Sequence, residues 1–168
     1  VGDIDYSSWE YDKVKAMRQP GSTFKLFVYT EAMNQGLTPC DRRVDEWKAY
    51  PDTVHGKVIQ WAPHNANGYF THANMTLKSA FAQSINSIAV KLGYECGIPN
   101  IIRTAHAMGI QSPLDNLPSL SLGASDVNLL ELANAYCTIA DNGKHVDPVL
   151  VTRIIDKDGR EVYKAPKT

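Results

Sequence analysis

Five stretches with helical periodicity occupy the middle of this chain, and they limit its possible folds more than any other feature. The first begins at Ser22, where apolar residues recur at helical spacing until Gly36 and Pro39 signal a stop. The others are predicted at 76–83, 88–97, 99–109 and 127–143. We expect Thr76, Pro99, and either Ser125 or Asp126 to start three of them. The last helix should present one apolar face, made of Leu129, Leu132, Ala133, Tyr136 and Ile139.

Strand signals flank this helical region. The opening segment VGDIDYSSWE predicts a strand that runs into a loop. Residues 40–74 are rich in Pro, Asn, Gly and aromatic residues, which indicates an extended insertion containing a hairpin. Residues 149–165 alternate around Asp158-Gly159, which predicts a β-hairpin. Helices grouped between flanking strands predict an α+β fold.

The composition argues against several classes of function. The chain has 168 residues, enough for one domain, and its net charge of −1 gives no electrostatic argument for binding nucleic acid. The three cysteines and five histidines show no metal-ligand or disulfide spacing, so we expect no metal and no cofactor. No apolar run approaches the roughly 18 residues that a membrane span needs. We expect both ends to be cut from a longer protein.

The stretch RQPGSTFKLFVY, residues 18–29, places a serine and a lysine three residues apart where the first helix begins. Residues at i and i+3 share a helix face, so Ser22 and Lys25 should lie together. A serine hydroxyl needs a base, and a lysine can be that base only if its pKa is lowered by burial or by cationic neighbours. Phe24 and Phe27 supply apolar surroundings. The alternative is a surface pair, because S-x-x-K arises by chance about once in such a chain.

A second polar pair, Ser84 and Asn86, stands where the second and third helical stretches are interrupted. Side chains at i and i+2 in a break between helices can point into a cleft. A simple capping or turn motif is the alternative.

Several stretches resemble class A (bifunctional) penicillin-binding proteins, in the correct order and over nearly the whole chain. They are RQPGSTFKLFVYTEAMNQGLTP, WAPHNANGY, TLKSAFAQSINSIAVKLG and SLSLGASDVNLLELANAYCTIADNG. The resemblance implies the penicillin-binding transpeptidase and serine β-lactamase-like fold, a helical cluster packed on an antiparallel sheet. It also implies a location on the extracytoplasmic, periplasmic side of the bacterial inner membrane, with the membrane anchor outside this chain.

The resemblance also implies roles for individual residues. Ser22 would attack a D-Ala-D-Ala peptide of a peptidoglycan stem, or a β-lactam, and Lys25 would take its proton. Ser84 would relay that proton to the leaving D-alanine, while Asn86 would hold Lys25 and a substrate amide. The backbone N–H of Ser22 would stabilise the oxyanion. We further predict that Trp61 and Tyr69, with residues 65–67 between them, rim the cleft near Ser84. The alternative is that Trp61 only pins the loop to the core.

The family's third motif, K-T/S-G-T/S on a core strand, has no counterpart here, since Lys167-Thr168 is not followed by glycine. Residues 1–168 are therefore expected to be a partial transpeptidase domain with an incomplete sheet. We expect either that a separate polypeptide carries the remaining strands, or that this chain alone does not react with penicillin.

Two other functions remain open on the same fold. A serine β-lactamase needs a base for hydrolysis, and Glu131 begins ELAN rather than the E-x-x-L-N order of that family. A non-catalytic β-lactam sensor or interaction module would keep the same serines and lysine. Covalent labelling followed by turnover separates these possibilities.

Overall fold

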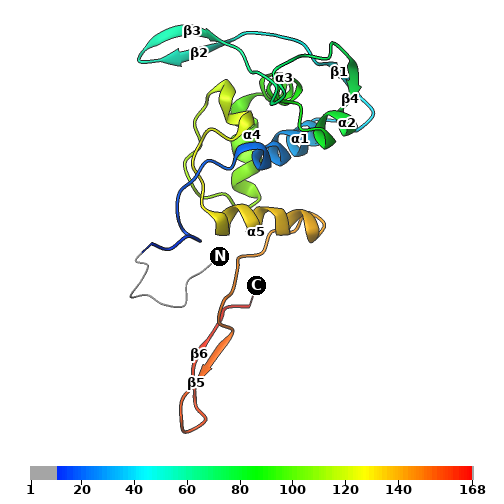
Figure 1. The fold of residues 1–168 in the computed structure, drawn as a ribbon. Coiled ribbons are helices and arrows are strands. Elements are labelled where there is room, and N and C mark those ends of the chain that lie inside the picture. Colours follow the sequence, from blue (N-terminus) through cyan, green and yellow to red (C-terminus); the bar gives the residue numbers. More distant parts are fainter. Residues whose placement is uncertain (1–10, 168) are drawn as a thin grey trace.

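The computed structural model describes residues 11–167, and its centre is a cluster of helices (Figure 1). The predicted strand at 1–10 lies outside the described residues. A 3₁₀ helix, η1 (Gly21–Phe24), leads directly into α1 (Lys25–Asn34). Helices α2 (Leu77–Ala82), α3 (Asn86–Cys96) and α4 (Ile98–Ala107) follow, then η2 (Pro118–Leu122) and α5 (Leu129–Ala140).

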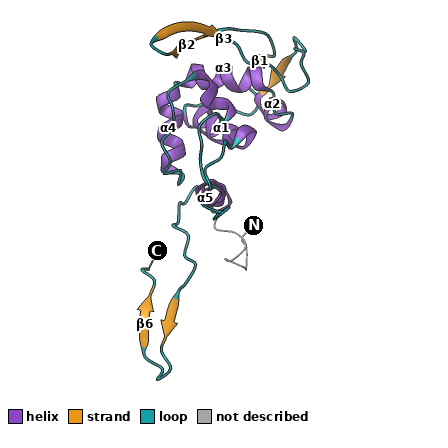
Figure 2. Ribbon diagram, turned by 60° about the vertical axis from the view of Figure 1, so that its left-hand side comes forward, coloured by secondary structure: helices purple, strands orange, loops and turns teal. Residues whose placement is uncertain are grey.

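The described strands form three separate antiparallel pairs around these helices (Figure 2). Strand β1 (Arg42–Val44) pairs with β4 (Asn74–Thr76), and β2 (Tyr50–Val54) pairs with β3 (Lys57–Trp61). Strand β5 (Arg153–Ile155) pairs with β6 (Glu161–Lys164) in a hairpin that projects away from the helices. The predicted hairpins in the 40–74 insertion and in the tail are thus confirmed. The fold is α+β, with an incomplete sheet in the described chain.

The hydrophobic core lies between α1, α3 and α4. Phe24, Phe27 and Val28 come from the first helical unit and are fully buried. They belong to one cluster with Ile88 and Ile101. Burying such side chains contributes roughly 1.5–3 kcal/mol each. The N-terminal end of α1 is therefore held by a packed core rather than by solvent-exposed contacts.

Local signals explain most helix boundaries. Thr76 caps α2 as predicted, since its Oγ1 accepts the Ser79 amide at 3.2 Å. The interruption predicted at 84–86 is found at residues 83–85, so Ser84 lies in the break and Asn86 is already the first residue of α3. The predicted cap of α5 at Ser125 or Asp126 is wrong. Asn128 is the cap, and it forms a reciprocal capping box with Glu131.

The α5 helix buries a different face from the one its sequence suggests. Glu131, Ala135 and Thr138 are its buried residues. Three members of the predicted apolar face, Leu129, Tyr136 and Ile139, remain 43%, 41% and 45% exposed. The apolar stripe is present, but nothing in the described chain covers most of it.

Candidate active site

Lys25 stands at the centre of a group of polar atoms contributed by α1 and by the α2–α3 turn. Its side chain is 2% exposed. Its Nζ lies 2.9 Å from Ser84 Oγ, 2.9 Å from the Ser84 carbonyl oxygen and 2.6 Å from Asn86 Oδ1. The structure thus brings Lys25 together with Ser84 and Asn86, which follow it by about sixty positions in the chain. All three are predicted catalytic or binding residues.

The electrostatics at Lys25 favour a base. Burial lowers the pKa of its ammonium group from the usual 10.5 to about 8. A neutral amine has two N–H donors and one lone pair. The Ser84 carbonyl and the Asn86 amide oxygen can only accept, so they match those two donors. The lone pair is then left for a hydroxyl proton.

Ser22 occupies the second position of η1, with its side chain exposed. Its carbonyl oxygen accepts the backbone N–H of Lys25, which is the first residue of α1. In a 3₁₀ helix the side chains at i and i+3 eclipse each other. Ser22 and Lys25 therefore project from the same side of the helix, Ser22 exposed and Lys25 buried. Within the described residues no hydrogen bond joins Ser22 Oγ to Lys25 Nζ, whose partners are on Ser84 and Asn86.

The segment before Ser22 is fixed by close contact with the segment between η2 and α5. Gly21 and Gly123 both have positive φ, of 59° and 75°. A Cβ on Gly123 would lie 2.2 Å from the Gly21 carbonyl oxygen, so only glycine permits this approach. Arg18 and Val127 exchange backbone hydrogen bonds of 2.9 Å on the same side. The position of Ser22 thus depends on residues about a hundred positions further along the chain.

Tyr136 of α5 adds one more contact to this region. Its hydroxyl donates to the Thr23 carbonyl oxygen at 2.8 Å. Thr23 follows Ser22, so the contact holds the other side of the serine.

Ser84 adopts an unusual backbone conformation that aims it at Lys25. Its φ is 53°, in the left-handed region that non-glycine residues seldom occupy. The Ser84 amide donates to the Phe81 carbonyl and the Ile85 amide to that of Ala80, both at 3.0 Å. This tight turn ends α2 and directs both the carbonyl and the hydroxyl of Ser84 toward one amine.

Asn86 is oriented from the opposite side by the loop that follows β3. Its Nδ2 donates to the His64 carbonyl oxygen at 2.8 Å. A carbonyl can only accept, so this contact fixes the amide with Nδ2 toward His64 and Oδ1 toward Lys25.

The predicted rim residues belong to the same loop region. Asn65 is buried, and its side chain contacts Asp45 and the Ser87 amide. The Trp61 side chain is half-buried at the end of β3, and Tyr69 is 60% exposed. The loop therefore reaches the start of α3. That the Trp61 and Tyr69 side chains rim a cleft near Ser84 stays a prediction.

Glu131 has a structural role rather than that of an exposed base. Its carboxylate accepts hydrogen bonds from the backbone amides of Gln111, Ser112 and Asn128 and from the Ser112 hydroxyl. Burial would raise the pKa of this carboxyl, but these hydrogen bonds outweigh burial and hold the pKa below its usual range.

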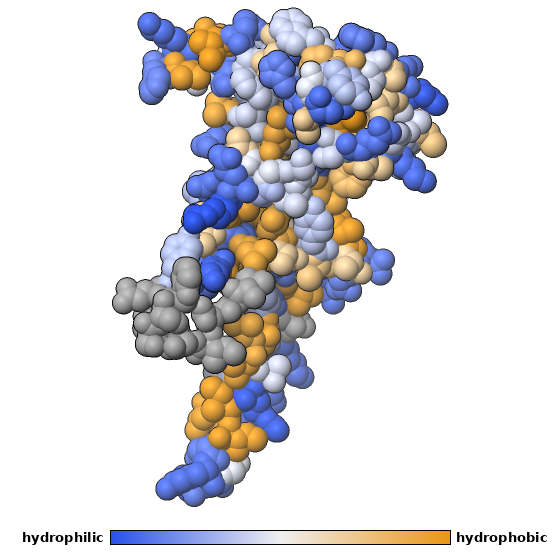
Figure 3. Space-filling model, viewed as in Figure 1, coloured by the Kyte–Doolittle hydropathy of each residue, from blue (hydrophilic) through white to orange (hydrophobic). Residues whose placement is uncertain are grey.

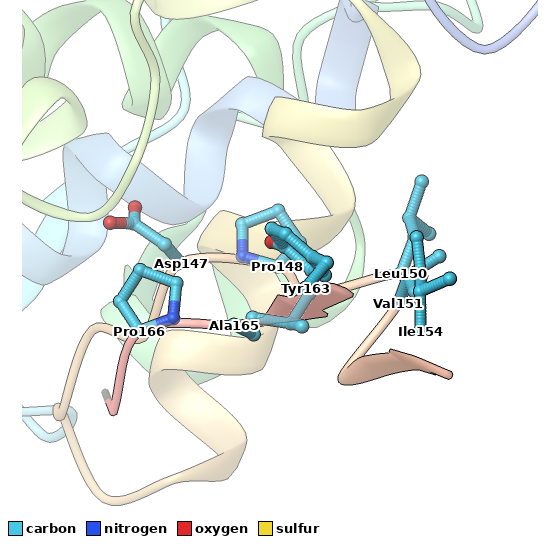
Figure 4. A pocket seen from close by; sticks show the side chains of 9 residues that line it. Asp147, Pro148, Leu150, Val151, Ile154, Tyr163, Ala165 and Pro166 are labelled. Carbon is cyan, nitrogen blue, oxygen red and sulfur yellow. The ribbon is translucent and has the colours of Figure 1, made fainter. Parts of the chain in front are cut away.

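One apolar hollow lies in the tail, away from Lys25. It has a volume of about 560 Å³ and lies between the 147–151 segment and the β5–β6 hairpin (Figure 4). Pro148, Leu150, Val151, Ile154 and Tyr163 line it, and they make it mainly apolar. Over residues 11–167, no group of three or more His, Cys, Asp or Glu side chains could hold a metal ion.

Comparisons with known proteins agree with this arrangement. Residues 3–168 match the family described as the penicillin binding protein transpeptidase domain. Penicillin-binding protein 2D of Bacillus subtilis is 35% identical over 99% of this chain and 24% of its own length. Penicillin-binding protein 1A of Rickettsia prowazekii is 33% identical over 98% of this chain and 21% of its own length.

Solved structures show the same fold. A crystal structure of penicillin-binding protein 1A from Haemophilus influenzae has a TM-score of 0.86 at 26% identity, over 98% of this chain and 24% of that one. Penicillin-binding protein A of Mycobacterium tuberculosis, in an imipenem acyl-enzyme complex, has a TM-score of 0.78 at 23% identity, over 96% of this chain and 41% of that one.

The chain belongs to the penicillin-binding protein transpeptidase family. It spans 24% and 21% of the length of the two relatives named above, penicillin-binding proteins 2D and 1A.

Proposed function

We propose that this chain forms the serine-bearing part of a D,D-transpeptidase that cross-links peptidoglycan stem peptides and is inhibited by β-lactams. The observation that carries the proposal is the set of contacts at Lys25: a buried amine within 2.9 Å of the Ser84 hydroxyl and 2.6 Å of the Asn86 amide oxygen. Ser22 stands one 3₁₀ turn before that amine. A nucleophile, a base and a second hydroxyl are what acyl transfer requires.

In the proposed acylation, Ser22 Oγ attacks the carbonyl carbon between the two D-alanine residues while neutral Lys25 takes the hydroxyl proton. The carbonyl becomes an oxyanion, and the backbone N–H of Ser22 is one of its donors. The oxyanion collapses and the C–N bond breaks as Ser84 gives its proton to the departing amine of D-alanine and regains one from the Lys25 ammonium, which returns to the neutral amine. The result is an ester between the stem peptide and Ser22.

In the transfer step, an amine from a neighbouring stem peptide attacks this ester. The amine loses a proton through Ser84 and Lys25, the C–O bond breaks, and Ser22 Oγ regains a proton. The products are a cross-link and the free enzyme. A β-lactam would acylate Ser22 by the same first step, except that its amine leaving group stays tethered to the acyl group. No cofactor takes part in this scheme.

We also propose that further polypeptide completes the domain. Exposed apolar side chains run along the tail and into the β5–β6 hairpin (Figure 3): Leu150, just before β5, is 91% exposed, and Val162 of β6 is 62% exposed. Together with the exposed stripe on α5, this is more apolar surface than single scattered residues produce. If residues 1–168 are expressed alone, we expect weak folding and no labelling by penicillin. A cooperative unfolding transition with stoichiometric labelling would contradict this proposal.

The family relationship further supports an extracytoplasmic location, on the periplasmic side of the bacterial inner membrane. Among residues 11–167, no helix is both long and apolar enough to cross a bilayer. We propose, from the family relationship, that the membrane anchor of the full-length protein lies outside this chain.

The direct test of this function is a turnover assay on the full-length protein. A donor peptide ending in D-Ala-D-Ala and an amine acceptor should give both free D-alanine and a cross-linked product. Rapid hydrolysis of a β-lactam would instead identify a β-lactamase. Labelling without any cross-linked product would identify a sensor module.

A further inference from the structure

A buried carboxylate, Asp45, lies next to the proposed site but has no part in the chemistry described above. It follows β1 and is 0% exposed. Its Oδ1 accepts the Ser87 hydroxyl at 2.6 Å and Asn65 Nδ2 at 2.7 Å. Its Oδ2 accepts the backbone N–H of Thr71 at 2.9 Å and the Thr71 hydroxyl at 2.8 Å.

This anion is held by neutral donors alone. Within the described chain, no lysine, arginine or histidine forms a salt bridge with Asp45. Burial would raise the pKa of its carboxyl, but hydrogen bonds from Ser87, Thr71 and Asn65 outweigh burial and hold the pKa below its usual range. A buried charge with four well-placed donors orders the groups that donate to it, because losing any donor leaves part of the charge unsatisfied.

Two of these donors are chain neighbours of Asn86 and of the residue that holds its amide. Ser87 directly follows Asn86 at the start of α3, and its backbone N–H donates to Asn65 Oδ1 at 3.1 Å. Asn65 directly follows His64, whose carbonyl oxygen accepts Asn86 Nδ2. Asp45 therefore fastens both the helix that carries Asn86 and the loop that orients the Asn86 amide.

We infer that Asp45 is a positioning residue for the proposed transpeptidase reaction: it locks the Asn86 amide so that Oδ1 faces Lys25. The inference rests on the proposed function, since it assigns Asp45 a part in acylation through Asn86 and Lys25. Asp45 touches neither the substrate nor the reacting atoms.

The test compares Asp45→Asn with the parent in the full-length protein, using penicillin as the probe. In an asparagine, an NH₂ group replaces one carboxylate oxygen and cannot accept the hydrogen bonds that this oxygen accepted. One side chain then no longer holds both the loop after β3 and the start of α3. Acylation should slow by up to roughly 10²-fold, the effect of a misplacement of about 1 Å. The acid limb of the acylation rate should also move to lower pH, because the Lys25 ammonium loses an acceptor.

Glu131→Gln is the matched control. Glu131 is a second buried carboxylate with four donors and no salt bridge within the described chain, but its partners are Gln111, Ser112 and Asn128. Its loss should lower the melting temperature and leave both the acylation rate and the acid limb near those of the parent. Ser87→Ala removes one donor to Asp45 and should give a smaller slowing than Asp45→Asn. It serves as the decisive variant if Asp45→Asn does not fold.

Parental acylation and an unmoved acid limb in folded Asp45→Asn would overturn the inference. If that variant does not fold, parental acylation in Ser87→Ala would do the same. Equal slowing in Glu131→Gln would assign the effect to stability and overturn it too. Failure of the proposed function has a different signature: the parent would not be labelled, or Ser22→Ala would still be labelled.

Discussion

The Nζ atom of Lys25 lies 2.6 Å from Oδ1 of Asn86, and this contact links the first helix to the third. It couples the protonation of the amine to the orientation of one amide. An ammonium gains from the acceptor, while burial works against it and brings the pKa to about 8. The balance leaves an appreciable neutral fraction near neutral pH, which a base requires.

The pH dependence of acylation should follow this balance. The rate should rise with pH and level off above about 8, since only neutral Lys25 accepts a proton. Asn86→Asp places a negative charge beside the amine, which favours the ammonium and should raise its pKa by roughly 1–3. The acid limb should then move to higher pH, as measured by stopped-flow acylation. Asn142→Asp, an exposed position just after α5, is the control, and an unchanged limb in Asn86→Asp would argue against the coupling.

The stability of the fold should also depend on Lys25. The unfolded chain binds this proton up to about pH 10.5 and the folded chain only up to about 8. Between these values the unfolded state binds more protons, so stability rises with pH across that window. Below pH 8 the folded chain must keep Lys25 protonated in a buried site, which lowers the free energy of unfolding by about 3 kcal/mol.

Lys25→Met removes this cost. The free energy of unfolding of the variant should exceed that of the parent most below pH 8, and this difference should shrink as the pH rises to 10.5. Urea unfolding of both proteins from pH 7 to 10.5 measures the difference, and parallel stability curves would contradict the assignment.

Ser84 carries backbone strain that can be measured separately from its hydroxyl. Ser84→Gly and Ser84→Ala both remove Oγ, and both should slow acylation. Only glycine relieves the positive φ of 53°. The glycine variant should therefore be more stable than the alanine variant by roughly 1 kcal/mol. Equal unfolding free energies would mean that the left-handed conformation stores no strain.

Gly123 should affect the reaction from outside the site. In Gly123→Ala the new methyl group would overlap the Gly21 backbone, so the segment before Ser22 must shift. We expect slower acylation and a loss of stability greater than the ~1 kcal/mol cost of positive φ alone.

Gly143→Ala is the control for that prediction. Gly143 has a φ of 86°, and a Cβ there meets nothing within 4 Å. Gly143→Ala should lose about as much stability as positive φ alone costs an alanine, but its acylation rate should match that of the parent. If both variants acylate equally fast, the Gly21–Gly123 contact does not position Ser22.

Much of this organisation could be predicted from local sequence. The His55-Gly56 and Asp158-Gly159 segments lie in the two hairpin turns, where positive φ at Gly56 and Gly159 suits glycine. The S-x-x-K and S-x-N spacings included Lys25, Ser84 and Asn86, whose polar atoms meet in the structure; that Ser22 acts with them stays a prediction. The cap of α5 was missed because Asn128-x-x-Glu131 was not recognised as a capping box, although that signal is local.

The Asp45 network could not have been found in the same way. Asn65 lies 20 residues after Asp45, and Ser87 lies 42 residues after it. No short sequence motif covers such separations. Only the tertiary fold brings β1, the loop after β3 and α3 together. The buried face of α5 was misjudged for a related reason: Leu132 packs against the core, but Leu129, Tyr136 and Ile139 stay largely exposed in the described chain, so periodicity alone indicated the wrong side.

The most direct test of the account is the site of acylation. The full-length protein and its Ser22→Ala variant should be incubated with penicillin and examined by intact-mass spectrometry. The parent should gain the mass of one penicillin, and digestion should locate it on Ser22. The variant should gain nothing while keeping the melting temperature of the parent. A folded Ser22→Ala variant that still becomes labelled would contradict the assignment of Ser22 as the nucleophile.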